Sequence, residues 1–281
     1  MPTLAVNGVD LYYEEVGSGE PILFLHEFAG DYRSWEPQMR VFGRWYRAVT
    51  ISYRGYPGSS VPTEAEAYSH DILMDDMLGV LDALEIDQAH LCGCSVGANA
   101  SIAFSTLHPE RCKSICAIGV GHGSVKGEER QRVIDDFTTR AAIILEGGVE
   151  AVVEKQSNGV SRLPMKVKDP RGHEEYWQRF LEHAPEGSAY TALGVPPKRP
   201  NFYDIEDALK EIDVPVLIML GDQDANCIEG SWFLKKTMPR AGLMSFPMGG
   251  HVLNLEDPDM FNKAYLDFLT AVSAGKWQKP E

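Results

Sequence analysis

The hydrophobic pattern of the chain alternates short apolar runs with longer mixed segments. Residues 21–26 have the sequence PILFLH, residues 86–92 have IDQAHLC after a polar turn, and residues 214–220 have VPVLIML. Apolar runs of this length are typical of strands in a parallel sheet that is covered on both faces. Because such strands alternate with helix-forming segments over residues 21–105 and 214–271, the pattern predicts βαβ units and an α/β fold.

The stretch between these two regions, residues 121–200, has no comparable strands. It is rich in helix formers at residues 128–146 and 174–183, and Gly147, Gly148 and several prolines interrupt it. We therefore expect a helical cap inserted over the carboxyl edge of the sheet.

The same pattern predicts how the chain is divided. We expect a core domain of residues 1–120 and 201–273 and a cap of residues 121–200. The proline-rich sequence PPKRP at residues 196–200 is expected to be a stiff exit linker. The polar segment 274–281 is expected to be a frayed C-terminal tail.

The composition argues against some classes of partner and indicates the environment in which the protein is expected to act. The 26 Lys and Arg residues against 41 Asp and Glu give a net charge of −15, which argues against nucleic acid and anionic membrane surfaces as partners. The N-terminus lacks the basic and apolar segments of a signal peptide, and no apolar run approaches the roughly 20 residues that span a bilayer. The five cysteines lack zinc-site spacing and are expected to be free thiols in a reducing cytoplasm. We expect no metal and no cofactor.

The most informative motif is GCSVG at residues 93–97, which joins an expected strand to a small-residue segment typical of a helix. G-x-S-x-G between strand and helix is the nucleophile elbow, a tight turn that raises the serine hydroxyl above the sheet. The glycines are needed because a Cβ at either position would collide with the turn. Cys94 is a rival nucleophile, but its flanking positions are Cys92 and Val96, so the pattern favours Ser95.

A serine hydroxyl needs a base, and the base needs an orienting acid. The expected strand at residues 214–220 ends in GDQD, which places Asp222 and Asp224 at a carboxyl edge, where open α/β sheets build their sites. A second short strand at residues 243–246 leads to the sequence GGH, which ends at His251. The chain therefore offers the nucleophile, the acid and the base in the order Ser, Asp, His.

With these motifs the chain resembles the α/β-hydrolase family, specifically its cofactor-free, cap-bearing, esterase-like branch, over nearly its whole length. The sequence PILFLH followed by EFAG resembles the family's third strand and oxyanion loop, and SYRGYPGSS at residues 52–60 resembles its segment after the fourth strand. His251, Glu256 and Pro258 match its C-terminal signature, where Asp257 is expected to be the N-cap of the last helix. The resemblance implies a mostly parallel, eight-stranded sheet flanked by helices, with an inserted helical cap.

The resemblance also implies a mechanism. The family takes its acid from the last position of Gly-x-x-Asp, which here is Asp224, with Asp222 as the alternative. His251 would take the proton of Ser95 as its oxygen attacks an acyl carbon, and the acid would hold the imidazole.

Two backbone N–H groups, those of Val96 and Phe28, are expected to meet the tetrahedral oxyanion. In proteins of this family the histidine at the position of His26 supports the oxyanion loop through hydrogen bonds. A direct role for His26 in proton transfer is the less favoured alternative.

Several further residues are candidates for the substrate pocket or its support. Glu27 stands where most of the family has glycine. It either braces the oxyanion loop by pairing with Arg54 or Arg33, or faces the pocket and binds a polar or cationic substrate group. Bracing is favoured because a buried, unpaired carboxylate is costly. His122, where the chain leaves the sheet for the cap, is either a pocket residue or an exposed loop histidine.

The cap aromatics Tyr176, Trp177 and Phe180 have helical spacing. They form either the cap's own core, which is favoured, or a substrate cage, so Trp177 is a candidate pocket residue together with Cys94.

These residues predict a serine hydrolase that cleaves a small or medium carboxylic ester, lactone or amide through an acyl-enzyme. Halide displacement and epoxide opening are disfavoured, because related enzymes of those kinds carry Asp at the elbow. One alternative is hydrolysis of a carbon–carbon bond in a diketone by the same residues. Another is a ligand receptor on this fold with negligible turnover. The expected partner is a small-molecule substrate, and the resemblance is compatible with a homodimer.

Overall fold

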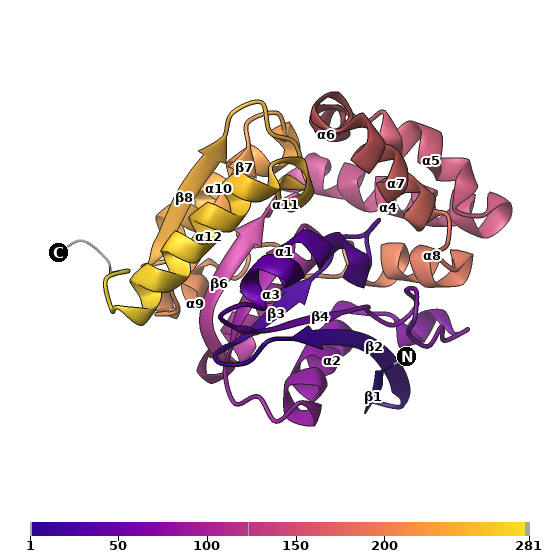
Figure 1. Ribbon diagram of the computed structural model, residues 1–281. Coiled ribbons are helices and arrows are strands. Elements are labelled where there is room, and N and C mark those ends of the chain that lie inside the picture. The colour runs from indigo at the N-terminus through magenta and orange to yellow at the C-terminus, as the bar shows by residue number, and fades with distance from the viewer. Residues whose placement is uncertain (1, 123, 279–281) are drawn as a thin grey trace.

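The computed structural model describes residues 2–122 and 124–278, and it confirms the α/β architecture (Figure 1). A single eight-stranded sheet has the order β1-β2-β4-β3-β5-β6-β7-β8. β1 pairs antiparallel with β2, and β2 with β4, whereas the pairings from β4 through β8 are parallel. The strands are β1 (Thr3–Val6), β2 (Val9–Val16), β3 (Pro21–Leu25), β4 (Arg47–Ile51), β5 (Ala89–Cys94), β6 (Cys112–Ile118), β7 (Val216–Gly221) and β8 (Ala241–Phe246).

Helices flank the sheet. α1 and α12 lie side by side (Figure 1), and α3 packs against β5 and β6. Ten consecutive residues of α3, from Val96 to Ser105, are buried, because their small side chains let the helix approach the strands closely. The helices outside the inserted region are α1 (Glu36–Phe42), α2 (His70–Ala83), α3 (Val96–Leu107), α9 (Glu206–Glu211), α10 (Ala225–Thr237), α11 (Leu253–Glu256) and α12 (Pro258–Ser273).

A helical region is inserted between β6 and α9, as the sequence predicts. Its helices gather beyond the carboxyl end of β6 (Figure 1). The insertion contacts the loop after β8 directly, since the N–H of His251 donates to the carbonyl oxygen of Ser161 at 3.0 Å. The helices of the insertion are α4 (Gly127–Gly147), α5 (Glu150–Ser157), the 3-10 turn η4 (Val160–Arg162), α6 (Leu163–Lys168), α7 (Pro170–Phe180) and α8 (Pro185–Gly194).

Two details of the C-terminal region differ from expectation. Asp257 occupies the N-cap position of α12, but its side chain makes no cap hydrogen bond and pairs with Lys168 of the insertion instead. The tail is held at Trp277, whose ring packs edge-on against Phe268 and whose Nε1 donates to the carbonyl oxygen of Arg240 at 2.8 Å. The expectation of a frayed tail is therefore wrong at Trp277, and residues 279–281 lie outside the described residues.

Within the described ranges, no helix is long and apolar enough to cross a membrane.

Candidate active site

The GCSVG motif forms a strained turn between β5 and α3. Ser95 has φ +51° and ψ −106°, a backbone conformation that a residue with a side chain rarely adopts. A Cβ on Gly93 would lie 2.3 Å from the Gly97 backbone, and one on Gly97 would lie 2.2 Å from the carbonyl oxygen of Leu25. Only glycine fits at these two positions, so the local geometry is that of a nucleophile elbow.

Asp224 and His251 meet at the carboxyl edge of the sheet, in the loops that follow β7 and β8. His251 Nδ1 lies 2.6 Å from Asp224 Oδ2. Burial raises the pKa of Asp224, but the charge and hydrogen bond of His251 outweigh it and hold that pKa at about 2. Asp222 is exposed, and its carboxylate accepts from Gln223. The structure thus brings Asp224, and not Asp222, to the imidazole.

A cavity of about 300 Å³ opens at this edge of the sheet, beneath the helical insertion. Its lining includes six residues that the sequence singled out: Phe28, Ser95, Val96, His122, Asp224 and His251. Ser95 and His251 face the same space, although among the described residues no hydrogen bond joins Ser95 Oγ to the imidazole. Such catalytic hydrogen bonds are often long in ligand-free enzymes and tighten with substrate.

Phe28 and Val96, whose backbone amides are the candidate oxyanion donors, both line this cavity. Val96 is the first residue of α3, so its N–H has no acceptor within the helix and belongs to the positive end of the helix dipole. Phe28 follows β3 in the loop that lines the same cavity, and Tyr56 Oη holds this loop by donating to the Phe28 carbonyl oxygen at 3.1 Å. The arrangement supplies two candidate N–H donors for one oxygen.

Glu256 fixes the backbone around His251. Its Oε2 accepts from the N–H of Gly250 at 2.7 Å, and its Oε1 accepts from the N–H of Val252 at 3.1 Å. Burial raises the pKa of this carboxyl. The sequence pointed to Glu256 as part of a signature but assigned it no role; its position shows that it orders the loop carrying the imidazole.

His26 is fully buried and does not line the cavity. Its Nδ1 lies 2.8 Å from the carbonyl oxygen of Glu27, and its Nε2 accepts from the N–H of Tyr53 at 3.2 Å. Because an amide N–H can only donate, the ring carries its proton on Nδ1 and is neutral. Burial lowers the pKa of His26 to about 4. This geometry is that of a residue supporting the oxyanion loop.

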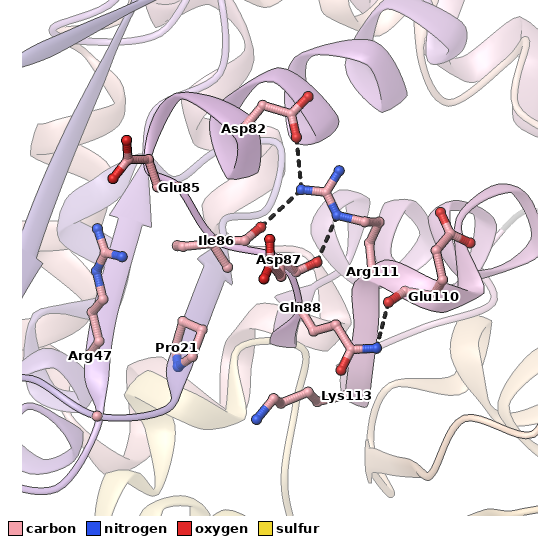
Figure 2. Close-up of a pocket in the computed structure, with 11 residues that line it drawn as sticks. Pro21, Arg47, Asp82, Glu85, Ile86, Asp87, Gln88, Glu110, Arg111 and Lys113 are labelled. Atoms are coloured by element: carbon pink, nitrogen blue, oxygen red, sulfur yellow. Dashed lines mark hydrogen bonds and ion pairs between the residues drawn. The ribbon is translucent and has the colours of Figure 1, made fainter.

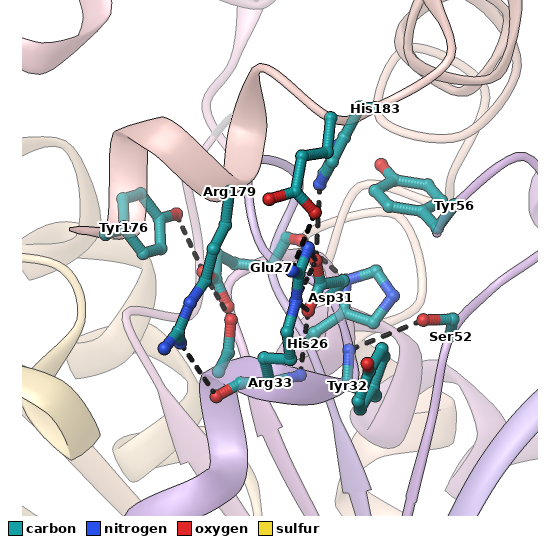
Figure 3. A network of polar contacts seen from close by, with 12 residues as sticks. His26, Glu27, Asp31, Tyr32, Arg33, Ser52, Tyr56, Tyr176, Arg179 and His183 are labelled. Atoms are coloured by element: carbon teal, nitrogen blue, oxygen red, sulfur yellow. Dashed lines mark hydrogen bonds and ion pairs between the residues drawn. The ribbon is translucent and has the colours of Figure 1, made fainter. Parts of the chain in front are cut away.

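Glu27 is also fully buried, and the partners expected for it are wrong (Figure 3). Its Oε1 accepts from Tyr176 Oη of α7 at 2.7 Å and from Ser34 Oγ at 3.2 Å, while Oε2 has no hydrogen-bond partner. The two expected arginine partners bind elsewhere: Arg54 pairs with Asp76, and Arg33 with Asp31 and Glu182. Arg54 and Glu27 do not line the cavity. The sequence missed Tyr176 as a partner because it lies 149 residues away.

Two other candidates lie behind the cavity wall. Trp177 packs against Tyr176 and Phe180, and its Nε1 donates to His173, so it belongs to the core of the insertion and does not line the cavity. Cys94 is buried, donates to the carbonyl oxygen of His251 at 3.5 Å, and has a pKa raised well above the usual value by burial. A thiol in that state is a poor nucleophile.

His122 lines the cavity, so of its two interpretations the structure favours the pocket residue over the exposed loop histidine. Burial lowers its pKa to about 4, with Arg199 acting in the same direction. Its carbonyl oxygen accepts from the Arg199 guanidinium.

The sequence missed three cavity arginines from the inserted region and its exit segment: Arg140, Arg162 and Arg199. Arg140 carried a usable signal. It lies on α4 between buried residues at helical spacing, Phe137, Ala141 and Ile144, which places it on the inward face of the helix. The turn containing Arg162 has no such periodicity.

A larger hollow of about 920 Å³ lies at the opposite, amino-terminal edge of the sheet (Figure 2). Its basic side chains are already paired with acidic ones: Arg47 with Glu15, Arg111 with Asp82 and Lys113 with Glu20. This hollow is open to solvent and lies at the end of β5 opposite to Ser95, so we assign it no role in catalysis.

Asp224, Cys227 and His251 offer ligand atoms within 4.8 Å of one another and are the one such group found among the described residues. Burial raises the pKa of Cys227 well above its usual value, and its thiol donates to the carbonyl oxygen of Gly119 at 3.2 Å. Because a metal prefers the thiolate, and because Asp224 already holds the imidazole, this group suits a hydrogen-bonded pair better than a metal site.

The elbow at Ser95 and the mostly parallel sheet with its helical insertion define the class of protein as an α/β-hydrolase. A family model for the alpha/beta hydrolase fold matches residues 20–258. The chain therefore belongs to the α/β-hydrolase fold family.

Individual relatives are distant but cover nearly the whole chain. The putative 2-succinyl-6-hydroxy-2,4-cyclohexadiene-1-carboxylate synthase of Bacillus subtilis is 26% identical, over 92% of this chain and 93% of its own length. The putative carbamate hydrolase RutD of Caulobacter segnis is 26% identical, over 96% and 99%. Among solved structures, Est816, described as an N-acyl homoserine lactone degrading enzyme, is 25% identical with a TM-score of 0.76, over 95% of this chain and all of its own.

Proposed function

We propose that the protein is a serine hydrolase that cleaves a carboxylic ester or lactone through an acyl-enzyme. The observation that carries this proposal is the convergence of Ser95 on its strained turn with the Asp224–His251 pair in one cavity. The carbamate hydrolase and the N-acyl homoserine lactone degrading enzyme among its relatives act on related carbonyl groups, which supports the same reaction class.

In this mechanism Ser95 Oγ attacks the carbonyl carbon, and His251 Nε2 takes its proton. Asp224 holds the ring through Nδ1 and stabilises the imidazolium that forms. The N–H groups of Val96 and Phe28 donate to the oxyanion of the tetrahedral intermediate. When the intermediate collapses, the alcohol leaves with the proton from Nε2, and a water molecule then repeats the sequence to release the acid.

The test is steady-state hydrolysis of 4-nitrophenyl acetate, butyrate and octanoate by wild type and by Ser95→Ala. We expect turnover by wild type and a loss of at least about 10³-fold in the variant. Cys94→Ala serves as the matched control, because it removes the neighbouring thiol and should retain activity. Turnover that survives Ser95→Ala, or is lost only in Cys94→Ala, would overturn the assignment of the nucleophile.

A further inference from the structure

The cavity is lined by more positive than negative charge, although the chain as a whole has a net charge of −15. Two carboxylates line it: Asp224, which is engaged with His251, and Asp136, which is exposed. The cationic side chains of the lining are Arg140, Lys155, Arg162 and Arg199. The positive charge is therefore concentrated at the cavity in an otherwise acidic protein, and an anionic ligand would complement it.

Arg140 has unused hydrogen-bond donors at this site. Its guanidinium lies over the rings of Phe28 and Phe137, at 5.4 Å and 4.8 Å from their centroids. Within the described part of the chain it makes no hydrogen bond and no ion pair. Burial lowers its pKa, the charge of Asp136 raises it, and the charge of Arg162 lowers it. Arg140 is half-buried, and a guanidinium without a protein partner leaves its N–H groups available to an anionic ligand.

Arg162 also lines the cavity, and it follows Ser161, whose carbonyl oxygen accepts from the His251 amide. Its guanidinium lies 5.4 Å from the Tyr176 ring centroid, and its Nη1 is buried without a hydrogen-bond partner. Burial lowers the pKa of Arg162, but Tyr176, Glu27 and other acidic groups raise it more, so the group stays charged.

Glu27 and Glu256 are the two carboxylates whose charges act on Arg162, and both make other hydrogen bonds, although Glu27 Oε2 has no partner among the described residues. Glu27 accepts from Tyr176 and Ser34, and Glu256 accepts from two backbone amides of the His251 loop. Neither forms an ion pair with Arg162 among the described residues. They keep the guanidinium ionised without using its donors.

Arg199 plays a different part. It is buried and donates to the carbonyl oxygen of His122, which fixes it in the wall, and burial lowers its pKa to about 9. It adds to the positive field, and its Nε is a further buried donor without a hydrogen-bond partner among the described residues.

We propose that the cavity selects esters or lactones that carry a carboxylate group, and that Arg140 and Arg162 bind this anion beside the scissile bond. A planar guanidinium matches a carboxylate with two parallel N–H···O bonds, which gives direction as well as affinity. The negative charge of the substrate then offsets part of the repulsion between the two like charges that face one cavity. This specificity rests on the hydrolase function proposed above.

The experiment compares matched pairs of substrates. 4-Nitrophenyl hydrogen suberate and 4-nitrophenyl octanoate differ by a carboxylate on the acyl side, and 4-acetoxybenzoate and 4-acetoxybenzamide differ by one on the alcohol side. We expect wild type to favour the anionic member of at least one pair by about 10-fold or more in kcat/KM. Arg140→Gln and Arg162→Gln should each remove most of that preference, while the neutral ester changes by less than about 3-fold.

Arg132→Gln is the matched control, because Arg132 is exposed on the same helix as Arg140 and does not line the cavity. Arg140→Lys keeps the charge without the planar fork and should fall between wild type and Arg140→Gln. An active enzyme with no preference in either pair, or equal losses on anionic and neutral esters, would overturn the inference and leave the hydrolase function standing.

If no ester is turned over, the binding of a dicarboxylate to an inactive variant still tests the anion site. Suberate is titrated calorimetrically into Ser95→Ala and into Ser95→Ala combined with Arg140→Gln. Binding that weakens by about 10-fold or more in the combined variant supports the anion site independently of catalysis. Absent or equal binding contradicts it.

Discussion

Tyr176 of α7 donates its phenolic hydrogen to Glu27 Oε1 at 2.7 Å, and so ties the helical insertion to the loop after β3. Glu27 is the residue before Phe28, whose amide is a candidate oxyanion donor. A second link is the ion pair between Arg33, in the segment between β3 and α1, and Glu182, which lies just beyond the end of α7, at 2.7 Å. The insertion that covers the cavity therefore also holds the loop that carries the candidate oxyanion donor Phe28.

Removing that phenol should weaken stability and catalysis together. In Tyr176→Phe the buried Glu27 carboxylate keeps only Ser34 as a partner, which costs about 1.5–3 kcal/mol. We expect a lower Tm and a kcat reduced by about 10-fold, less than the loss caused by removing an oxyanion donor outright. Tyr190→Phe is the control, because in the described residues the Tyr190 hydroxyl has no hydrogen-bond partner. A Tyr176→Phe protein with normal kcat would show that the loop holds its shape without this bond.

The acid can be assigned by a pair of substitutions two residues apart. Asp224→Asn replaces an acceptor with a group that favours the wrong tautomer of His251, and kcat should fall by about 10⁴-fold. Asp222→Asn changes an exposed carboxylate and should alter kcat by less than about 2-fold. The measurement is kcat on 4-nitrophenyl butyrate for both variants, with circular dichroism to confirm folding. Equal losses in the two variants would contradict the geometry at Asp224.

Glu256 should act through the position of His251. In Glu256→Gln one of the two amides that donate to it, Gly250 N–H or Val252 N–H, faces an NH₂ group instead of an oxygen. We expect a loss of about 1–3 kcal/mol in unfolding free energy and a lower kcat with KM nearly unchanged. Denaturant titration and kinetics on one preparation measure both. Glu211→Gln, at an exposed position of α9, should change neither quantity, and a Glu256→Gln enzyme with wild-type kcat would rule out the positioning role.

The parts of the site that follow local rules could be predicted from sequence. The elbow is set by steric limits within five residues, and the strand-end carboxylate and the loop histidine follow from parallel-sheet geometry, which brings carboxyl ends to one edge. Apolar runs likewise predict β3, β5 and β7, because each is buried along most of its length, whereas β8 is only partly buried.

The contacts that the sequence could not give are between side chains far apart in the chain. Arg54 was one of two arginines expected to pair with Glu27, but tertiary packing pairs it with Asp76 on α2 instead. Tyr176 looked like a core aromatic because spacing reports which face of a helix is buried, but not whether its hydroxyl meets a carboxylate. Arg162 could not be predicted as a cavity residue, because a three-residue turn has no periodicity that indicates which side chains point inward.

Acid stability should depend on His26. The unfolded chain takes up a proton on this residue near pH 6.5, whereas the folded protein does so only near pH 4, because the ring is buried and Nε2 accepts from the Tyr53 amide. Between these values the unfolded state binds more protons, so lowering the pH favours unfolding. The stability that neutral His26 contributes is complete above pH 6.5 and is lost as the pH falls toward 4. From pH 7.5 to 5.0 this residue alone should remove about 2 kcal/mol from the free energy of unfolding.

Urea unfolding of wild type and His26→Gln at the two pH values measures the difference. The variant starts less stable but should lose less between the two conditions than wild type. Parallel losses in wild type and His26→Gln would mean that His26 titrates normally in the folded protein, and that its ring is not locked between Glu27 and Tyr53.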